Sequence, residues 1–296
     1  MDTLQKEIIS ELRKQFVKMG FLSDKSDGRI CIGLSGGIDS TTIGLVADHL
    51  GLEVNAISYK RKDFESSDYN QAQKTCEILG WKFHTVVLKE ENPKDVFLSM
   101  IKDYNCKRKT EIECLYPYLP IFETAIDLGF EKLMVGFNTS PDNRKTATKC
   151  RQNPGAYWDD IIKRTETYRE VPTITKTNGN PLLSYACRKL YEVGKQKGIR
   201  VVAPMWGKKY NTLFQKRNLT PNDMNKGYNK SYLKLCFPEQ IEKIGMTKTK
   251  QMMLQKGGGI ESFFEPIIYD KEINFKDYKT DNVTSCLTKL SLLWGK

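Results

Sequence analysis

Short apolar runs and longer amphipathic stretches follow one another in a regular order from the N-terminus to residue 204. Each apolar run is five or six residues long, which is typical of a buried strand. The stretches between them carry apolar residues at intervals of three and four, which is typical of a helix with one buried face. The predicted strands span residues 30–34, 54–59, 83–88, 132–136 and 199–203. The predicted helices span residues 2–19, 39–50, 69–79, 93–104, 119–128 and 182–197.

Strands that alternate with helices predict a parallel sheet covered on both faces. We therefore expect an α/β fold with a doubly wound, five-stranded parallel sheet over residues 29–204, preceded by an N-terminal helix within residues 1–28. The polar segment 139–180 has no clear periodicity and predicts a lid-like insertion. After residue 204 the strand signals fade, so 205–296 is predicted to be a smaller, basic, mostly helical C-terminal region.

The cysteines and the N-terminal residues bear on where the protein works. No run approaches the roughly 20 apolar residues of a membrane span, and Lys6, Glu7 and Glu11 interrupt any signal-peptide core. The eight cysteines form no CxxC pair, and two histidines are too few for a histidine-rich metal site. We expect a soluble, cytoplasmic protein with reduced, mostly buried thiols.

The positive charge is concentrated in one part of the chain. The net charge is +11, and residues 201–256 hold eleven lysines and arginines against three acidic residues. Such a segment binds nucleic acid, surrounds a nucleotide triphosphate and its pyrophosphate product, or forms a solvated lysine face. The sequence leaves these three interpretations open.

Residues 30–42 read ICIGLSGGIDSTT and predict a strand, a glycine turn and the start of a helix. Adjacent glycines let the backbone approach an anion, and the amides at a helix start supply donors and partial positive charge. The lysine that a Walker A loop requires is absent, and GxGxxG does not fit between Gly33 and Gly44. The turn therefore indicates a phosphate-binding loop that is neither a Walker A loop nor a GxGxxG motif.

The segment matches SGGxDS at residues 35–40 and resembles the PP-loop ATP pyrophosphatases, a superfamily with a Rossmann-like fold of the HUP type. Its members include asparagine, NAD and GMP synthetases and several tRNA-modifying enzymes. The resemblance implies that ATP is cleaved between the α and β phosphates with Mg²⁺, giving an adenylate and pyrophosphate. PP-loop enzymes are commonly dimers, so a homodimer is a further expectation.

The resemblance also implies roles for individual residues. Asp39 and Asp142 would contact the metal, and Asp39, Ser35, Arg144 and Lys145 are the expected catalytic residues. The residues expected to contact ATP are Leu34, Ser35, Gly36, Gly37, Asp39, Ser40, Thr41, Ser58, Tyr59, Gly136 and Lys149.

The places of some of these residues in the predicted fold support their assignment to a ligand site. Ser35, Tyr59 and Asn138 lie just past predicted strand ends, and ligands of parallel sheets bind outside those ends. Several of the expected site residues also have an interpretation without a ligand. Asp39 could be an ordinary carboxylate in the first turn of a helix, where it interacts favourably with the helix dipole. Tyr59 could pack in the core, and the charged residues of the lid could simply be solvated.

Residues 64–88, FESSDYNQAQKTCEILGWKFHTVVL, resemble the asparagine synthetase-type domain, and residues 230–245 resemble it faintly. The chain begins MDTL, without the cysteine nucleophile of a glutaminase, and VGFNTSPDN replaces the SGxGADE motif. Nitrogen would then come from ammonia, an amine on another molecule or a separate subunit.

The leading hypothesis is an ATP-dependent, AMP-forming ligase that activates a carboxylate or carbonyl oxygen for attack by an amine. One alternative is a PP-loop enzyme that modifies a base of tRNA or DNA, which the basic segment favours. Another is a non-catalytic nucleotide- or RNA-binding module, against which the intact loop argues.

Overall fold

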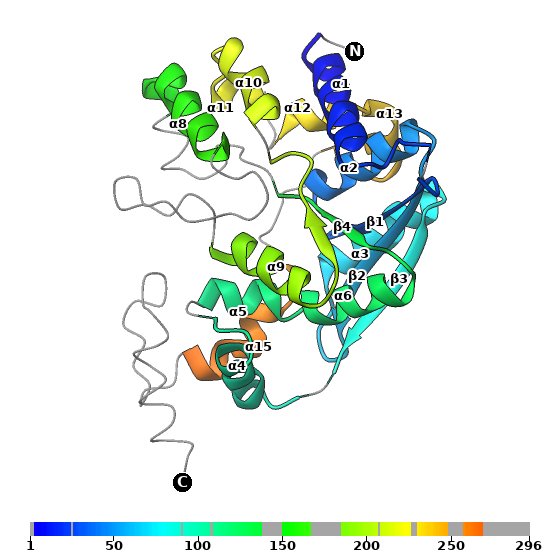
Figure 1. Ribbon diagram of the computed structural model, residues 1–296, viewed down its shortest axis with the longest axis vertical. Coiled ribbons are helices and arrows are strands. Elements are labelled where there is room, and N and C mark those ends of the chain that lie inside the picture. The colour runs from blue at the N-terminus through cyan, green and yellow to red at the C-terminus, as the bar shows by residue number, and fades with distance from the viewer. Residues whose placement is uncertain are drawn as a thin grey trace.

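The computed structural model describes residues 3–24, 26–89, 91–106, 109–137, 150–166, 185–206, 208–225, 230–247 and 257–268 (Figure 1). Five parallel strands form one sheet in the order β3-β2-β1-β4-β5, which confirms the predicted doubly wound α/β fold. The strands are β1 (Arg29–Gly33), β2 (Glu53–Arg61), β3 (Lys82–Leu88), β4 (Lys132–Val135) and β5 (Arg200–Val202). The strand order reverses between β1 and β4, so the ligand crevice of such a sheet is expected at their carboxyl ends.

Helices cover both faces of the sheet, and two hydrophobic cores result. Alternation along β1 explains the division, because Ile30 and Ile32 enter one core and Cys31 enters the other. The first core holds α1 (Thr3–Lys18), α2 (Ile38–His49), α3 (Ser67–Leu79), α8 (Pro154–Glu166), α10 (Lys208–Lys216), α11 (Pro221–Asn225), α12 (Ser231–Lys234) and α13 (Pro238–Lys243). The second holds α4 (Pro93–Lys102), α5 (Lys109–Leu115), α6 (Tyr118–Asp127), α9 (Tyr185–Gln196) and α15 (Ile260–Ile268).

Local signals set several helix boundaries. The Ser66 hydroxyl accepts a hydrogen bond from the Tyr69 amide at 3.1 Å and caps α3, which ends at the left-handed Gly80. Asn92 caps α4 in the same way, and Pro93 occupies its first turn. The six helices predicted from the sequence correspond to α1, α2, α3, α4, α6 and α9, in the expected order.

Part of the segment predicted to be a lid-like insertion forms a helix, which the sequence pattern did not indicate. Residues 154–166 form α8, whose Trp158 is fully buried against Phe214 of α10 at a ring-centroid distance of 5.3 Å. The apolar spacing of Tyr157, Trp158 and Ile161 is that of a helix, but proline and polar residues on both sides obscure it. The rest of the expected lid, 139–149 and 167–180, lies outside the described residues.

Residues beyond 204 contribute to both cores rather than to one. Tyr210, Phe214 and Tyr232 belong to the core under α1 and α2, whereas Ile260 and Phe264 pack on the opposite face with α4 and α5. Figure 1 shows α10 and α12 beside α1, and α15 beside α4. The domain division at residue 204 stays a prediction.

Two further findings concern the apolar helices and the cysteines. None of the helices in the described ranges has the length and apolar composition needed to cross a lipid bilayer. The six cysteines whose side chains the structure describes are buried and form no disulfide with one another, which agrees with the expected buried thiols. Burial raises the pKa of Cys31, Cys76, Cys106 and Cys236 to about 12.

Gly44 of α2 lies where its helix meets the Trp81 ring, and a Cβ atom there would be 2.4 Å from that ring. Gly44→Ala is expected to lower the free energy of unfolding by about 1–3 kcal/mol, because overpacking outweighs the gain in helix propensity. Gly155→Ala in α8 is the control, since its nearest neighbour is 3.7 Å away and no loss is expected. Urea unfolding of both variants measures the difference, and equal stability of the two would contradict the packing argument.

Candidate functional site

The loop between β1 and α2 lies at the carboxyl end of the central strand. Gly36 has a φ of +69°, and a Cβ atom there would lie 2.1 Å from the carbonyl oxygen of Asp68 in α3. Gly37 precedes α2 with extended backbone and receives no side-chain cap. The first turn of α2 therefore keeps amide groups that an anion could accept from.

Hydroxyl groups organise this loop. The Ser35 and Ser40 Oγ atoms are 3.2 Å apart, and the Ser40 hydroxyl also donates to the Gly37 carbonyl oxygen at 3.2 Å. The Gly37 amide donates to Ser35 Oγ at 3.4 Å. Ser35 and Ser40 are thus held around one point, and their role in binding phosphate stays a prediction.

Two other expected ATP contacts point into the protein. Leu34 is buried in the first core, and its amide donates to the Ile57 carbonyl oxygen at 2.9 Å. Thr41 is fully buried, and its Oγ1 has no hydrogen-bond partner among the described residues. A nucleotide would reach these two residues only through backbone groups or through a local change at Thr41.

Asp39, in the first turn of α2, forms a buried ion pair with Lys230. The Lys230 Nζ donates to Asp39 Oδ2 at 2.5 Å, and the exposed fractions of the two side chains are 6% and 8%. Lys230 immediately precedes α12 and has a φ of +53°. A residue from the basic C-terminal segment therefore reaches the SGGxDS loop.

Lys230 is a candidate functional residue that the sequence did not predict. It was one of eleven cations in the basic segment, and nothing in the local pattern distinguishes it from a surface lysine. Lys234 also points inward and donates to the Thr247 carbonyl oxygen at 3.0 Å, and burial lowers its pKa. The interpretation of 201–256 as a uniformly solvated face is thus wrong at these two positions.

The expectation that Tyr59 lies just past a strand end is also wrong. β2 continues to Arg61, and Ser58 and Tyr59 pair with Thr85 and Val86 of β3. The apolar run ends at Tyr59, but the backbone pairing continues through two basic residues. Tyr59 is buried in the second core, and this burial raises its pKa well above the ordinary value.

Residues 257–259, three consecutive glycines, pack onto the end of β2 and the start of α3. A Cβ atom at Gly258 would lie 1.9 Å from the Tyr59 hydroxyl oxygen, so only glycine fits there. The Ser66 hydroxyl donates to the Gly257 carbonyl oxygen at 2.8 Å, and Arg61 Nη1 donates to that of Gly259 at 2.6 Å. This segment covers the Tyr59 side chain.

Asp68 lies between the glycine loop and residues 257–259. Its carbonyl oxygen is the group that Gly36 approaches, and its carboxyl group lies where a Cβ atom at Gly257 would be. Burial raises the pKa of this carboxyl to about 6. Asp68 was not among the predicted site residues.

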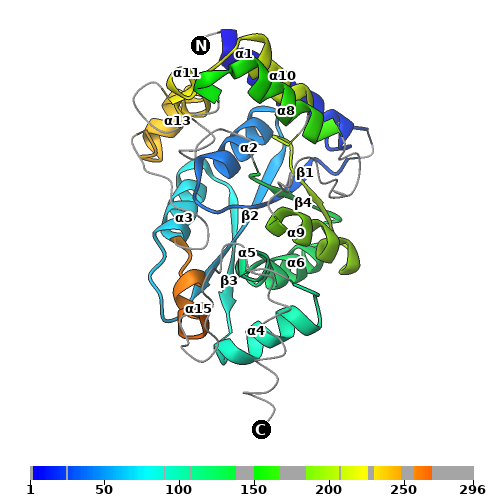
Figure 2. The ribbon, with the colours of Figure 1, turned by 90° about the vertical axis from the view of Figure 1, so that its left-hand side faces the viewer.

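Gly136 brings the end of β4 to the same place. A Cβ atom at Gly136 would lie 2.7 Å from the Ser40 amide nitrogen, so β4 and the first turn of α2 meet closely. Figure 2 shows α2, α5 and α9 around strands β1, β2 and β4. The other predicted site residues, Asp142, Arg144, Lys145 and Lys149, lie outside the described residues, as does Asn138.

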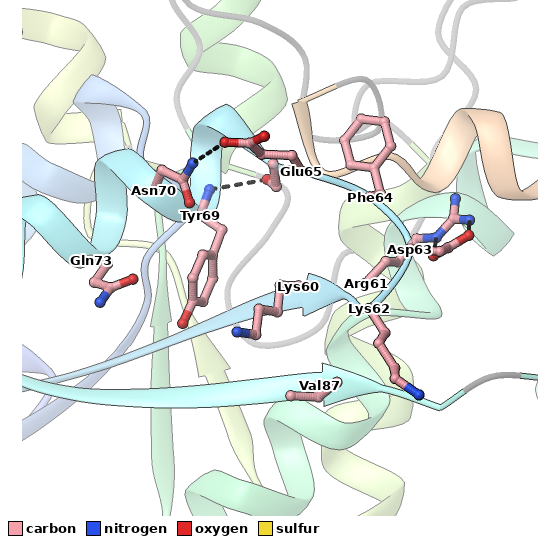
Figure 3. A pocket seen from close by; sticks show the side chains of 11 residues that line it. Lys60, Arg61, Lys62, Asp63, Phe64, Glu65, Tyr69, Asn70, Gln73 and Val87 are labelled. Atoms are coloured by element: carbon pink, nitrogen blue, oxygen red, sulfur yellow. Dashed lines mark hydrogen bonds and ion pairs between the residues drawn. The ribbon is translucent and has the colours of Figure 1, made fainter.

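A polar groove of about 740 Å³ lies beside the β2–α3 turn (Figure 3). The Lys60 ammonium lies 5.2 Å from the centroid of the Tyr69 ring, and Arg61 pairs with Asp63. Asn70 and Val87 line the groove from α3 and β3. The groove adjoins Ser66 but does not include the SGGxDS loop.

The metal-binding capacity of the described residues is limited. They contain no group of three or more histidine, cysteine, aspartate or glutamate side chains arranged around a common point.

Comparisons with known proteins show similarity to a protein family over part of the chain. Residues 22–110 match the family model described as asparagine synthase. The chain is 32% identical over 95 residues to the tRNA-specific 2-thiouridylase MnmA of Hahella chejuensis, covering 29% of this chain and 26% of that protein. It is 31% identical over 97 residues to the probable mitochondrial tRNA-specific 2-thiouridylase 1 of Caenorhabditis elegans, with the same coverage. The match spans about a quarter of the length of these relatives.

Solved structures show a more distant similarity. The U34-tRNA thiolase NcsA from Methanococcus maripaludis with its 4Fe-4S cluster gives a TM-score of 0.42 at 14% identity, covering 99% of this chain and 79% of that one. The NMN synthetase from Francisella tularensis gives 0.37 at 13% identity, covering 88% and 92%. Similarity at this level carries no argument about function.

Proposed function

We propose that this chain, whose residues 22–110 belong to the PP-loop ATP pyrophosphatase superfamily, adenylates a carbonyl oxygen of a tRNA base. The observation that carries the proposal is the intact SGGxDS loop at the carboxyl end of β1, with Ser35 and Ser40 held together beside the first amides of α2. The α-phosphorus of ATP would be attacked by the base oxygen, and pyrophosphate would leave.

The loop residues would hold the leaving pyrophosphate. The amides of the first turn of α2 and the Ser35 and Ser40 hydroxyls would donate to its oxygens, and such preorganised donors stabilise charge that develops in a transition state. The close approach of Gly136 to Ser40 leaves the strand end without a side chain that would obstruct AMP.

The residues present fit a divalent cation. The Asp39 carboxylate is already in contact with a positive charge, the Lys230 ammonium, so this position accommodates a cation. Asp39 would help to hold Mg²⁺, and the bound ion would supply positive charge that offsets the charge of the phosphates. Asp142 remains a proposed second contact.

Two observations favour tRNA as the acceptor. The curated relatives carry the name tRNA-specific 2-thiouridylase, so a uridine carbonyl in tRNA is the first acceptor to test. The net charge of +11 also suits a polyanionic partner. The nucleophile that displaces AMP from the base would then be a sulfur or nitrogen donor supplied separately.

A second candidate is the amide-forming ligase expected from the sequence. The match of residues 22–110 to the asparagine synthase model favours it. The two functions differ in their acceptor, and salt dependence distinguishes them. Only an enzyme that binds tRNA should lose affinity for its acceptor steeply as the salt concentration rises.

The test is pyrophosphate release from ATP labelled on the γ-phosphate. Unmodified transcribed tRNA is expected to stimulate release at least about tenfold at low salt, and raising the salt should remove the stimulation. The same tRNA after nuclease digestion is the control. ADP and orthophosphate as the sole products, or stimulation by small carboxylates but not by tRNA, would contradict the proposal.

A further inference from the structure

The buried pair of Asp39 and Lys230 joins two parts of the chain that are 191 residues apart. Both side chains are more than nine-tenths buried, so neither charge is stabilised by bulk water. A buried charge that loses its partner strongly destabilises a protein. In this structure the ammonium of Lys230 compensates the buried charge of Asp39.

A divalent cation at Asp39 would compete with Lys230 for that role. Mg²⁺ binds carboxylate oxygens at about 2.0–2.1 Å, and the Lys230 Nζ is already 2.5 Å from Asp39 Oδ2. Two cations this close in a poorly solvated site repel each other strongly. Both can remain only if the ammonium moves or phosphate oxygens enter between them.

We propose that the Lys230 ammonium fills the cation position beside Asp39 when no nucleotide is bound, and that it is displaced when a metal–nucleotide complex arrives. Lys230 is then a positioning residue that holds the Asp39 carboxyl group oriented for the incoming metal. The proposal rests on the metal role of Asp39 in the proposed function.

The surroundings of Lys230 suit such an exchange. Its side chain is long and flexible, so the ammonium can shift without moving the backbone of α2. Its φ of +53° is uncommon for a residue with a side chain, and strained backbone is found at switch positions. The Lys230 carbonyl oxygen accepts from the Leu233 amide at 3.0 Å, and the Ser231 hydroxyl donates to the Met224 carbonyl oxygen at 2.8 Å.

These contacts connect the exchange to the C-terminal half of the chain. Any backbone shift at Lys230 acts on α12, which packs against α2, and through Ser231 on the end of α11. Occupancy of the metal position is thereby coupled to helices that follow the sheet in sequence. If the ammonium is removed by substitution, a metal ion should be able to take its place beside Asp39 even without nucleotide.

The experiment compares wild type with Lys230→Met without nucleotide. In EDTA the variant is expected to unfold about 10 °C below wild type, because Asp39 has lost its cation. About 10 mM MgCl₂ should restore at least half of that loss in the variant and shift wild type by less than about 2 °C. Mn²⁺ titration followed by electron paramagnetic resonance should show at least roughly tenfold tighter binding to the variant than to wild type.

Two further variants serve as controls. Lys234→Met removes a neighbouring buried ammonium that contacts a carbonyl oxygen instead of Asp39, so it should gain no response to Mg²⁺. Asp39→Asn combined with Lys230→Met removes both charges and should also abolish the response. If Lys230→Met folds only with added cation, its refolding yield with MgCl₂ against NaCl of equal ionic strength gives the same answer.

A Lys230→Met protein whose stability and Mn²⁺ affinity do not respond to divalent cations would overturn the inference and leave the pair purely structural. Because no ATP or tRNA is used, failure of the proposed function would not change these results. Conversely, tRNA-dependent pyrophosphate release could persist if the cation exchange were absent.

Discussion

Asp39→Asn is expected to lower the rate of pyrophosphate release by roughly a hundred-fold or more. The amide has nearly the shape of the carboxylate but lacks the negative charge that would hold Mg²⁺ at the first turn of α2. The Lys230 ammonium would still find an oxygen acceptor at this position. The loss should thus appear mainly in the chemical step, and ATP labelled on the γ-phosphate measures it directly.

The choice of asparagine follows from the structure. Asp39→Ala would leave the buried Lys230 ammonium without this carboxylate, which is expected to cost about 3–5 kcal/mol and could unfold the protein. Asp48→Asn is the matched control, because Asp48 lies on the exposed end of the same helix and should tolerate the change with an unaltered rate. Full activity of Asp39→Asn would remove Asp39 from the metal role.

The fold could be predicted because its signals are local. Each strand of the sheet is an apolar run, and each helix between strands has its own amphipathic spacing and cap, such as Ser66 before α3. The order β3-β2-β1-β4-β5 is not encoded in these local signals and is known only from the structure. The predicted C-terminal end of β2 is two residues too early, because Lys60 and Arg61 have polar side chains but continue the backbone pairing with β3.

The site could be predicted only where it is contiguous in sequence. Ser35, Gly36 and Ser40 lie within one loop, and the structure brings their predicted groups together. Two residues of the C-terminal half reach this region from far along the chain: Lys230 contacts Asp39 of the loop, and Gly258 lies against Tyr59 of β2. No periodicity or local motif encodes such a contact, so a lysine in a basic segment and a glycine in a triplet could not be recognised as parts of the site.

A second large effect is expected at Gly36, where two constraints coincide. Its φ of +69° disfavours any side chain, and a Cβ atom would lie 2.1 Å from the Asp68 carbonyl oxygen. That neighbour is backbone at the first turn of α3 and cannot rotate away. Gly36→Ala must therefore displace the SGGxDS loop from α3, and we expect ATP affinity to fall by roughly a hundred-fold as the loop amides and hydroxyls lose their arrangement.

Gly51→Ala separates the two constraints. Gly51 has a φ of +76°, close to that of Gly36, but no atom lies within 4 Å of the position of its Cβ. This variant should lose only about 1–2 kcal/mol of stability from the backbone conformation and should bind ATP as wild type does. Calorimetric titration with ATP distinguishes the cases. If both variants bound ATP equally well, the contact between the loop and α3 would not determine nucleotide binding, and the hydroxyls of Ser35 and Ser40 would have to act independently of it.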